Sequence, residues 1–109
     1  MPPDQAAAGA QLAALIAADM PALQRLNFRG LSLGNAGWRP VVDALRVNQH
    51  VKSLICYDTG MSEAFAIEFF LPAVRANTSL RKLNASRHWL GTPPPAILEA
   101  EALVVARGR

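Results

Sequence analysis

LQRLNFRGLSLGNAGWRPVVDALRVNQH, residues 23–50, contains a strand pattern, a turn and a helix pattern in that order. Leu26 and Phe28 alternate with polar residues, which predicts a short strand with one buried face. A glycine-containing turn follows, and Val41 and Leu45 then recur at helical spacing. One such unit cannot bury both of its faces alone, so we expect further copies of it along the chain.

The unit recurs twice. Residues 51–79 match it at an offset of 28 in the strand part and 29 in the helix part. One residue is therefore inserted in the loop or the early helix of this copy. A third copy opens at Leu80, at an offset of 57. Self-similarity at this period predicts stacked repeats. We expect one domain over residues 1–109, with an N-terminal capping helix in 1–22 and repeats at 23–50, 51–79 and 80–109.

The segments DALRVNQHVKSL and PAVRANTSLRKL carry the clearest copies of the repeated pattern. This pattern resembles the leucine-rich repeat of the ribonuclease-inhibitor type over roughly 85 residues. The resemblance implies an α/β fold, a right-handed leucine-rich-repeat solenoid forming a short horseshoe arc. Its parallel strands would line the concave side and its helices the convex side. One position departs from the family pattern, which usually has Asn or Cys after the strand: here it holds Leu31, Thr59 and His88.

The composition is that of a folded domain. Hydrophobic residues make up 51% of the chain and charged residues 17%, which is too apolar for disorder. The net charge of +3 permits an acidic partner without requiring one. A single cysteine excludes an internal disulfide and fits a reducing compartment. No apolar run of about 18 residues is present, so we expect no membrane span and an intracellular, cytoplasmic protein.

The N-terminal segment is rich in alanine and superficially resembles a signal peptide. Asp4 precedes the apolar run of residues 6–18, however, where a signal peptide has Lys or Arg. Asp4 instead predicts the cap of a helix that begins near Gln5. We interpret this helix as the N-terminal cap of the repeats.

The third copy is followed by no polar capping unit. We therefore expect its strand to be an unpaired edge with exposed apolar residues, namely Leu80, Leu83, Ala85 and Leu90. An open strand edge invites pairing with another chain. This predicts a possible homo-oligomer or larger assembly through the C-terminal repeat.

Side chains that alternate with the buried strand residues should face outward from the sheet. Six of the eleven basic residues lie on these strand segments, and Asp58 is the one acid of eight that does. Ile55 and Tyr57 stand among them, and aromatic and arginine side chains are enriched in binding hot spots. We therefore predict a non-catalytic protein–protein interaction module that binds an acidic protein surface. The predicted partner-binding residues are Arg25, Asn27, Arg29, Ser53, Ile55, Tyr57, Lys82, Asn84 and Arg87.

Two alternatives stay open at this point. The basic strip could serve solubility alone, because solvated strand faces need charge. The chain could also be a structural subunit of a complex, or a fragment of a longer repeat protein, assembled through its open terminal edges. Nucleic acid is disfavoured as a partner because the strip lacks a second aromatic residue for base stacking and the net charge is low.

Catalytic and metal-binding patterns are weak. Cys56 could be a nucleophile with His50, His88 or Asp58 nearby, but it occupies a buried strand position where a small thiol is ordinary core. The two histidines and the cysteine do not have zinc-site spacing. We therefore expect no enzyme activity, no cofactor and no metal.

Three further residues leave a choice. Trp38 and Trp89 lie where strands pass into loops, and core packing is favoured over a role as interface anchors. Pro72 lies late in the helix of the second copy. It marks either a kink or the start of a separate last turn.

Overall fold

A computed structural model describes residues 5–87, 89 and 91–107. Its strands β1 (Arg25–Asn27), β2 (Ser53–Ile55) and β3 (Lys82–Asn84) form one parallel sheet in the order β1-β2-β3. Leu26 pairs with Leu54, and Leu54 pairs with Leu83. Parallel neighbours need long crossover connections, and helical segments supply them here.

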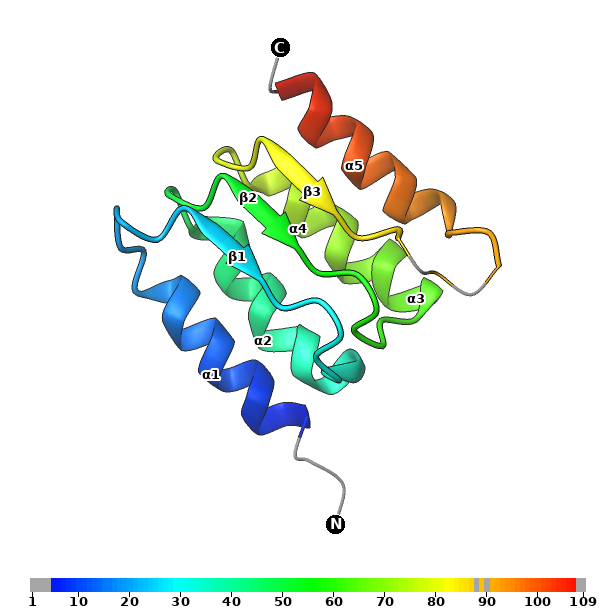
Figure 1. Cartoon of the computed structure of the whole chain (residues 1–109), viewed down its shortest axis with the longest axis horizontal. Helices are drawn as coiled ribbons and strands as arrows, with labels where there is room; N and C mark the ends of the chain where they lie inside the picture. The colour runs from blue at the N-terminus through cyan, green and yellow to red at the C-terminus, as the bar shows by residue number, and fades with distance from the viewer. Residues whose placement is uncertain (1–4, 88, 90, 108–109) are drawn as a thin grey trace.

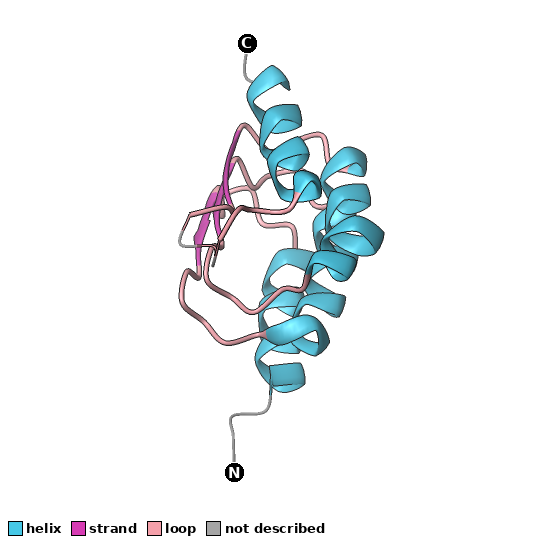
Figure 2. Ribbon diagram, turned by 90° about the vertical axis from the view of Figure 1, so that its right-hand side faces the viewer, coloured by secondary structure: helices cyan, strands magenta, loops and turns pink. Residues whose placement is uncertain are grey.

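Helices lie on one face of this sheet and leave the other face open (Figures 1 and 2). Helix α5 runs beside β3, and α1 packs against α2 at the opposite side of the molecule. The helical segments are α1 (Gln5–Ala17), α2 (Gly34–Val47), α3 (Glu63–Phe65), the π-helix η1 (Ala66–Phe70), α4 (Leu71–Ala76) and α5 (Pro95–Arg107).

The predicted fold class is corrected by this architecture. Each strand has only three residues, whereas three of the helices have 13 or 14. The radius of gyration is 12.7 Å, close to the roughly 13 Å of a compact domain of about 100 residues. The chain is therefore a small, mostly helical domain with a short parallel sheet, and the α/β leucine-rich-repeat solenoid expected from the sequence is wrong.

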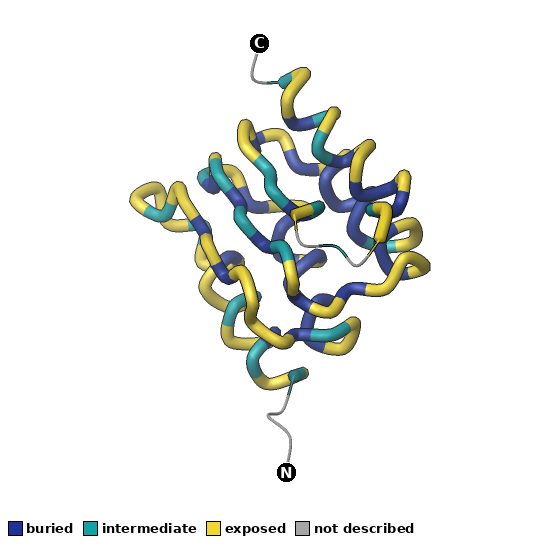
Figure 3. The backbone as a smooth tube through the Cα atoms, turned by 45° about the vertical axis from the view of Figure 1, so that its right-hand side comes forward, coloured by how far each residue is buried: buried dark blue, intermediate teal, exposed yellow. Residues whose placement is uncertain are grey.

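The core lies between the sheet and the helices (Figure 3). Leu26 and Leu54 point into it from the strands, and Val41 and Leu45 meet them from α2. Trp38 is fully buried, and its indole Nε1 donates a hydrogen bond to Thr59 Oγ1 at 3.0 Å. The core interpretation of Trp38 is therefore confirmed.

The residue inserted in the second copy falls in η1. Trp38 corresponds to Ala66 at an offset of 28 and Val41 to Phe70 at 29, so the extra residue lies within Ala66–Phe70. A π-helical turn is wider than an α-helical turn and takes up one more residue. Pro72 then lies in the first turn of α4, where a missing N–H is harmless. Pro72 thus belongs to the start of a new helical segment.

Two buried asparagines join the ends of helices to the strands that follow. Asn77 Nδ2 donates to Leu45 O at 2.8 Å and to Asn48 O at 3.1 Å, and its Oδ1 accepts from the N–H groups of Ser79 and Leu80 at 2.9 Å each. Asn48 acts in the same way: its Nδ2 donates to Ile16 O, and its Oδ1 accepts from the backbone N–H groups of the turn. These side chains satisfy backbone groups that a helix end leaves without partners.

Helix α1 approaches α2 through glycine. A Cβ atom on Gly9 would lie 1.9 Å from the carbonyl oxygen of Gly37, so only glycine fits at this contact. Ile16 anchors the same helix in the core, while most of its alanines remain exposed. This helix covers α2, as the prediction of an N-terminal cap requires.

The outer edge of β3 is closed at its C-terminal end, which corrects the predicted open edge. Glu101 of α5 accepts hydrogen bonds from the N–H groups of Ala85 and Ser86 at 2.8 and 3.0 Å. Leu80 is fully buried and Ala85 is 4% exposed, while Leu83 is partly buried. The sequence could not show that α5 folds back against this edge. Asp4, His88 and Leu90, to which the sequence also assigned roles, lie outside the described residues.

Candidate functional site

The open face of the sheet carries the predicted partner-binding residues. Arg25 and Asn27 of β1 and Lys82 of β3 are exposed, and Ser53 and Ile55 of β2 are half-buried. The inward-facing Leu26 and Leu54 between them are buried, as the period-two pattern requires. Arg29, Tyr57, Asn84 and Arg87 lie at or beyond the C-terminal ends of the same strands.

A groove of about 560 Å³ crosses the end of this face where the strands begin. We call it the basic groove. It brings together five of the predicted residues and two more cations that directly precede the strands. Its lining is Arg25, Leu26, Asn27, Lys52, Ser53, Ile55, Arg81 and Lys82.

Four cations of the basic groove face no counter-charge. The ion pairs among the described residues join Arg39 to Asp43, His50 to Asp19, and Arg75 to Glu99. None of these pairs involves a residue of the groove. Four positive charges in one shallow groove raise the local electrostatic potential and attract anionic groups. An arriving carboxylate would therefore not have to displace an existing partner.

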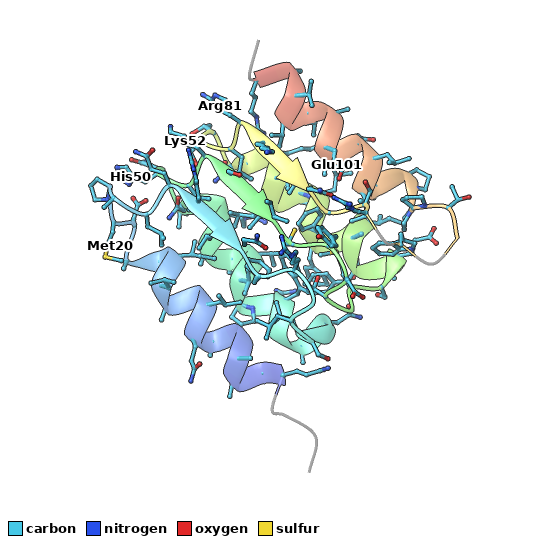
Figure 4. All side chains as sticks on the ribbon, viewed as in Figure 1. Met20, His50, Lys52, Arg81 and Glu101 are labelled. Atoms are coloured by element: carbon cyan, nitrogen blue, oxygen red, sulfur yellow. The ribbon has the colours of Figure 1, made fainter. Side chains whose placement is uncertain are left out.

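The backbone fixes the positions of Lys52 and Arg81. Lys52 O accepts hydrogen bonds from the N–H groups of Arg81 and Lys82 at 2.8 and 3.0 Å. Arg81 Nη1 donates to Thr78 O and Leu80 O, which holds the guanidinium near the start of β3. Its Nε and Nη2 have no hydrogen-bond acceptor among the described residues. Figure 4 shows Lys52 and Arg81 together at this end of the sheet, away from Glu101.

The opposite end of the face is different. The guanidinium of Arg87 lies 5.8 Å from the centre of the Tyr57 ring, within the range of a cation–π contact. Beside them, Asp58 adopts a φ of 59°, a left-handed conformation that aspartate tolerates better than most residues. The two ends of the strands therefore present different chemistry, with lysine and arginine at one end and an aromatic ring with an acid at the other.

An apolar cavity of about 200 Å³ opens at this second end. Its walls come from the loop after β2, the loop after β3 and the first turn of α5. Its principal lining residues are Cys56, Asp58, Met61, Ala85, Trp89 and Ile97. Trp89 is half-buried and forms one wall, so it is less completely part of the core than Trp38.

Cys56 occupies the core position predicted for it. It is 2% exposed, and burial raises the pKa of its thiol, with a smaller contribution from the negative charge of Glu101. A raised thiol pKa leaves little of the nucleophilic thiolate. His50 does not approach Cys56 as a general base would, because its Nδ1 lies 2.9 Å from Asp19 Oδ1 at the other end of the sheet.

Within residues 5–87, 89 and 91–107, no three metal-ligating side chains come together. None of the helices in this part of the chain has the length and apolarity needed to cross a membrane. Thr59, at a position that departs from the family pattern, is buried and donates its hydroxyl to Cys56 O at 2.8 Å. Leu31, at the equivalent position of the first copy, is exposed instead.

The sequence pointed to the strand residues of the groove but gave less weight to Lys52 and Arg81. Both stand one position before a strand, where alternation does not decide which way a side chain faces. Their shared signal is position: each directly precedes a period-two segment at the same offset in two copies. The sequence missed the apolar cavity altogether, because its walls come from three segments far apart in the chain.

No protein-family model and no curated protein matches the sequence. Among solved structures, the chain is similar to one described as leiomodin-1 actin-binding site 2 (ABS2), with a TM-score of 0.66 and 21% sequence identity. The alignment covers 83% of this chain and 53% of that chain. The chain thus spans about half the length of the structure that it resembles.

At this identity the likeness concerns the fold. It agrees with a small, mostly helical domain with three short parallel strands. The resemblance to the ribonuclease-inhibitor type of leucine-rich repeat, and the assignment as a solenoid, are overturned by this comparison and by the balance of helix and strand. The internal similarity at 28 and 29 residues remains visible in the strand pairing, where Arg25 lies beside Ser53 and Ser53 beside Lys82.

Proposed function

We propose that this chain is a non-catalytic protein-interaction module whose basic groove binds an acidic segment of a partner protein. The observation that carries the proposal is the group of four cations, Arg25, Lys52, Arg81 and Lys82, that line one groove without a counter-charge. Charge complementarity of this kind steers association and sets specificity. The half-buried Ile55 on the same surface supplies apolar contact area.

The neighbouring structure supports a protein as the partner. That structure is described as an actin-binding site, so actin is the first protein to test. The likeness concerns the fold, and function depends on the residues that a fold displays. The proposal therefore rests on the basic groove of this chain, and actin is one candidate partner.

The absence of catalysis is part of the proposal. Cys56 is buried and its thiol pKa is raised, which favours a structural role for this residue. The alternative of a subunit assembled through open terminal edges loses its main argument, because Glu101 occupies the N–H groups of Ala85 and Ser86 at the edge of β3.

The test compares two double variants with equal changes in net charge. Arg25→Glu/Lys82→Glu reverses two cations of the groove, and Arg39→Glu/Arg46→Glu reverses two exposed cations of α2. Binding is measured by fluorescence anisotropy with a labelled peptide of 12 residues that contains four glutamates, and separately with monomeric actin. We expect the groove variant to bind at least about tenfold more weakly, a loss that high salt reproduces in the unaltered protein.

Equal affinity of the two variants for every acidic probe would contradict the proposal, as would the absence of binding by the unaltered protein. Either outcome would leave the groove with a role in solubility alone. Circular dichroism of both variants confirms that they are folded. Peptide binding without actin binding would retain the groove as the binding site and exclude actin as its partner.

A further inference from the structure

The apolar cavity at the C-terminal end of the sheet has no role in the proposed function so far. Its volume of about 200 Å³ is below the roughly 300 Å³ at which pockets for drug-sized ligands begin. Met61, Ala85 and Ile97 make most of its wall apolar, while Asp58 stands at its exposed rim. A space of this size and lining fits one apolar side chain.

The cavity and the basic groove are joined by the same strand. Lys52 and Ser53 line the groove, and Cys56 and Asp58 line the cavity. Six residues separate Lys52 from Asp58, which corresponds to about 20 Å of extended chain. A partner segment that lies along β2 would therefore reach both places with about six residues of its own.

The charges along this path favour one kind of segment. Arg25, Lys52, Arg81 and Lys82 attract acidic residues at the groove end, while Asp58 repels them at the cavity end. An acidic segment would therefore be held at one end only, and the apolar cavity is available to the other end. Half-buried Ile55 lies between them and offers an apolar surface for the middle of the segment.

We propose that the cavity is an anchor site for a leucine- or phenylalanine-sized side chain of the partner, about six residues away from the acidic residues that bind the basic groove. This inference rests on the proposed function, because it concerns the same bound segment. The partner is thus an extended peptide segment with two parts, one acidic and one apolar.

The test uses three synthetic peptides and the unaltered protein. The first carries three glutamates alone, the second adds a leucine six residues away, and the third places that leucine two residues away. We expect the second peptide to bind at least about tenfold more tightly than the first and the third, because only its leucine reaches the cavity. Methyl resonances of Met61 and Ile97 should shift with the second peptide only.

A protein variant provides an independent check. Ala85→Leu fills the cavity from within and should remove the advantage of the second peptide while leaving the affinity for the first unchanged. Should this variant fail to fold, Trp89→Ala opens one wall of the cavity at a half-buried position and should reduce the same advantage.

The outcomes separate the two proposals. Equal affinity for all three peptides, with unchanged methyl resonances, would overturn the anchor site and leave groove binding intact. Methyl shifts with a leucine peptide that lacks the glutamates would also overturn the inference, because the cavity would then act without the groove. No binding of any peptide would overturn both proposals together.

Discussion

The turns before β3 and before β1 perform the same task with different chemistry. Before β3, Asn77 is fully buried and uses both its oxygen and its nitrogen on backbone groups. Asp19 stands 29 residues before Asn48, as Asn48 stands 29 before Asn77. It is partly exposed, and its Oδ1 accepts from Gln49 N–H at 2.8 Å and contacts His50 Nδ1.

The difference follows from the surroundings of each turn. A buried turn presents both carbonyl oxygens and N–H groups that need partners, and an amide can serve both kinds where a carboxylate serves only N–H groups. The turn at Asp19 has solvent beside it and a histidine within reach, so a charged acceptor is tolerated there. The same sequence position thus carries an amide in the interior and an acid at the end of the fold.

The largest expected effect comes from Asn77→Ala. The variant leaves the N–H groups of Ser79 and Leu80 and the carbonyl of Leu45 without their partner in the interior. We expect a loss of about 3–4 kcal/mol in the free energy of unfolding, measured by urea denaturation. A loss no larger than that of Asp19→Ala would break the comparison, because burial would then not distinguish the two turns.

Asn77→Asp sharpens the same comparison. A carboxylate at this position would face two carbonyl oxygens, so burial and repulsion would raise its pKa above the ordinary value. A raised folded-state pKa means that the variant is most stable at low pH and loses stability as the pH rises through that pKa. Urea midpoints measured between pH 4 and 8 should therefore fall with rising pH relative to those of the unaltered protein.

An intermediate effect is expected at the edge of β3. Glu101→Ala removes the acceptor for Ala85 N–H, Ser86 N–H and the Ser86 hydroxyl. Because this site is half-buried, we expect a loss of about 1–2 kcal/mol in the free energy of unfolding. Glu99→Ala, which breaks an exposed ion pair with Arg75 on the same helix, is the matched control and should cost less than about 1 kcal/mol. Equal losses would show that the edge contact adds nothing.

The smallest expected effect is that of Asp19→Asn, and it should appear only in acid. The hydrogen bond from Gln49 N–H and then that from His50 lower the pKa of Asp19 below its ordinary value of 3.8. The stabilisation is therefore complete above pH 3.8 and is lost as the pH falls through the lower folded-state pKa. The unaltered protein should lose its advantage over the variant below about pH 4, as thermal unfolding at a series of pH values would show. A constant difference at all pH values would contradict this assignment.

Local pattern predicted several parts of the fold. The alternation around Leu26, the core position of Cys56, the N-terminal helix and the extra residue of the second copy were all apparent in the sequence. The outward-facing strand residues of the basic groove followed from the same alternation. These features depend on neighbours within a few positions, which a sequence displays directly.

Contacts between distant segments produced the errors. The copies at 28 and 29 residues suggested a solenoid, but three-residue strands under long helices form a small, mostly helical domain. The edge of β3 was predicted to be open because nothing near it in the sequence closes it. Glu101 closes it from 15 and 16 positions away.

The sequence by itself determined which residues alternate, where helices begin and where one residue is inserted, because these depend on backbone sterics and on the burial of one face of each segment. Only the tertiary structure decided that Asn48 and Asn77 bind carbonyls about 30 residues away, that α5 packs against β3, and that three loops enclose an apolar cavity. These arrangements depend on how the helices pack against one another. Such packing is a balance of many weak contacts between segments that no local pattern records.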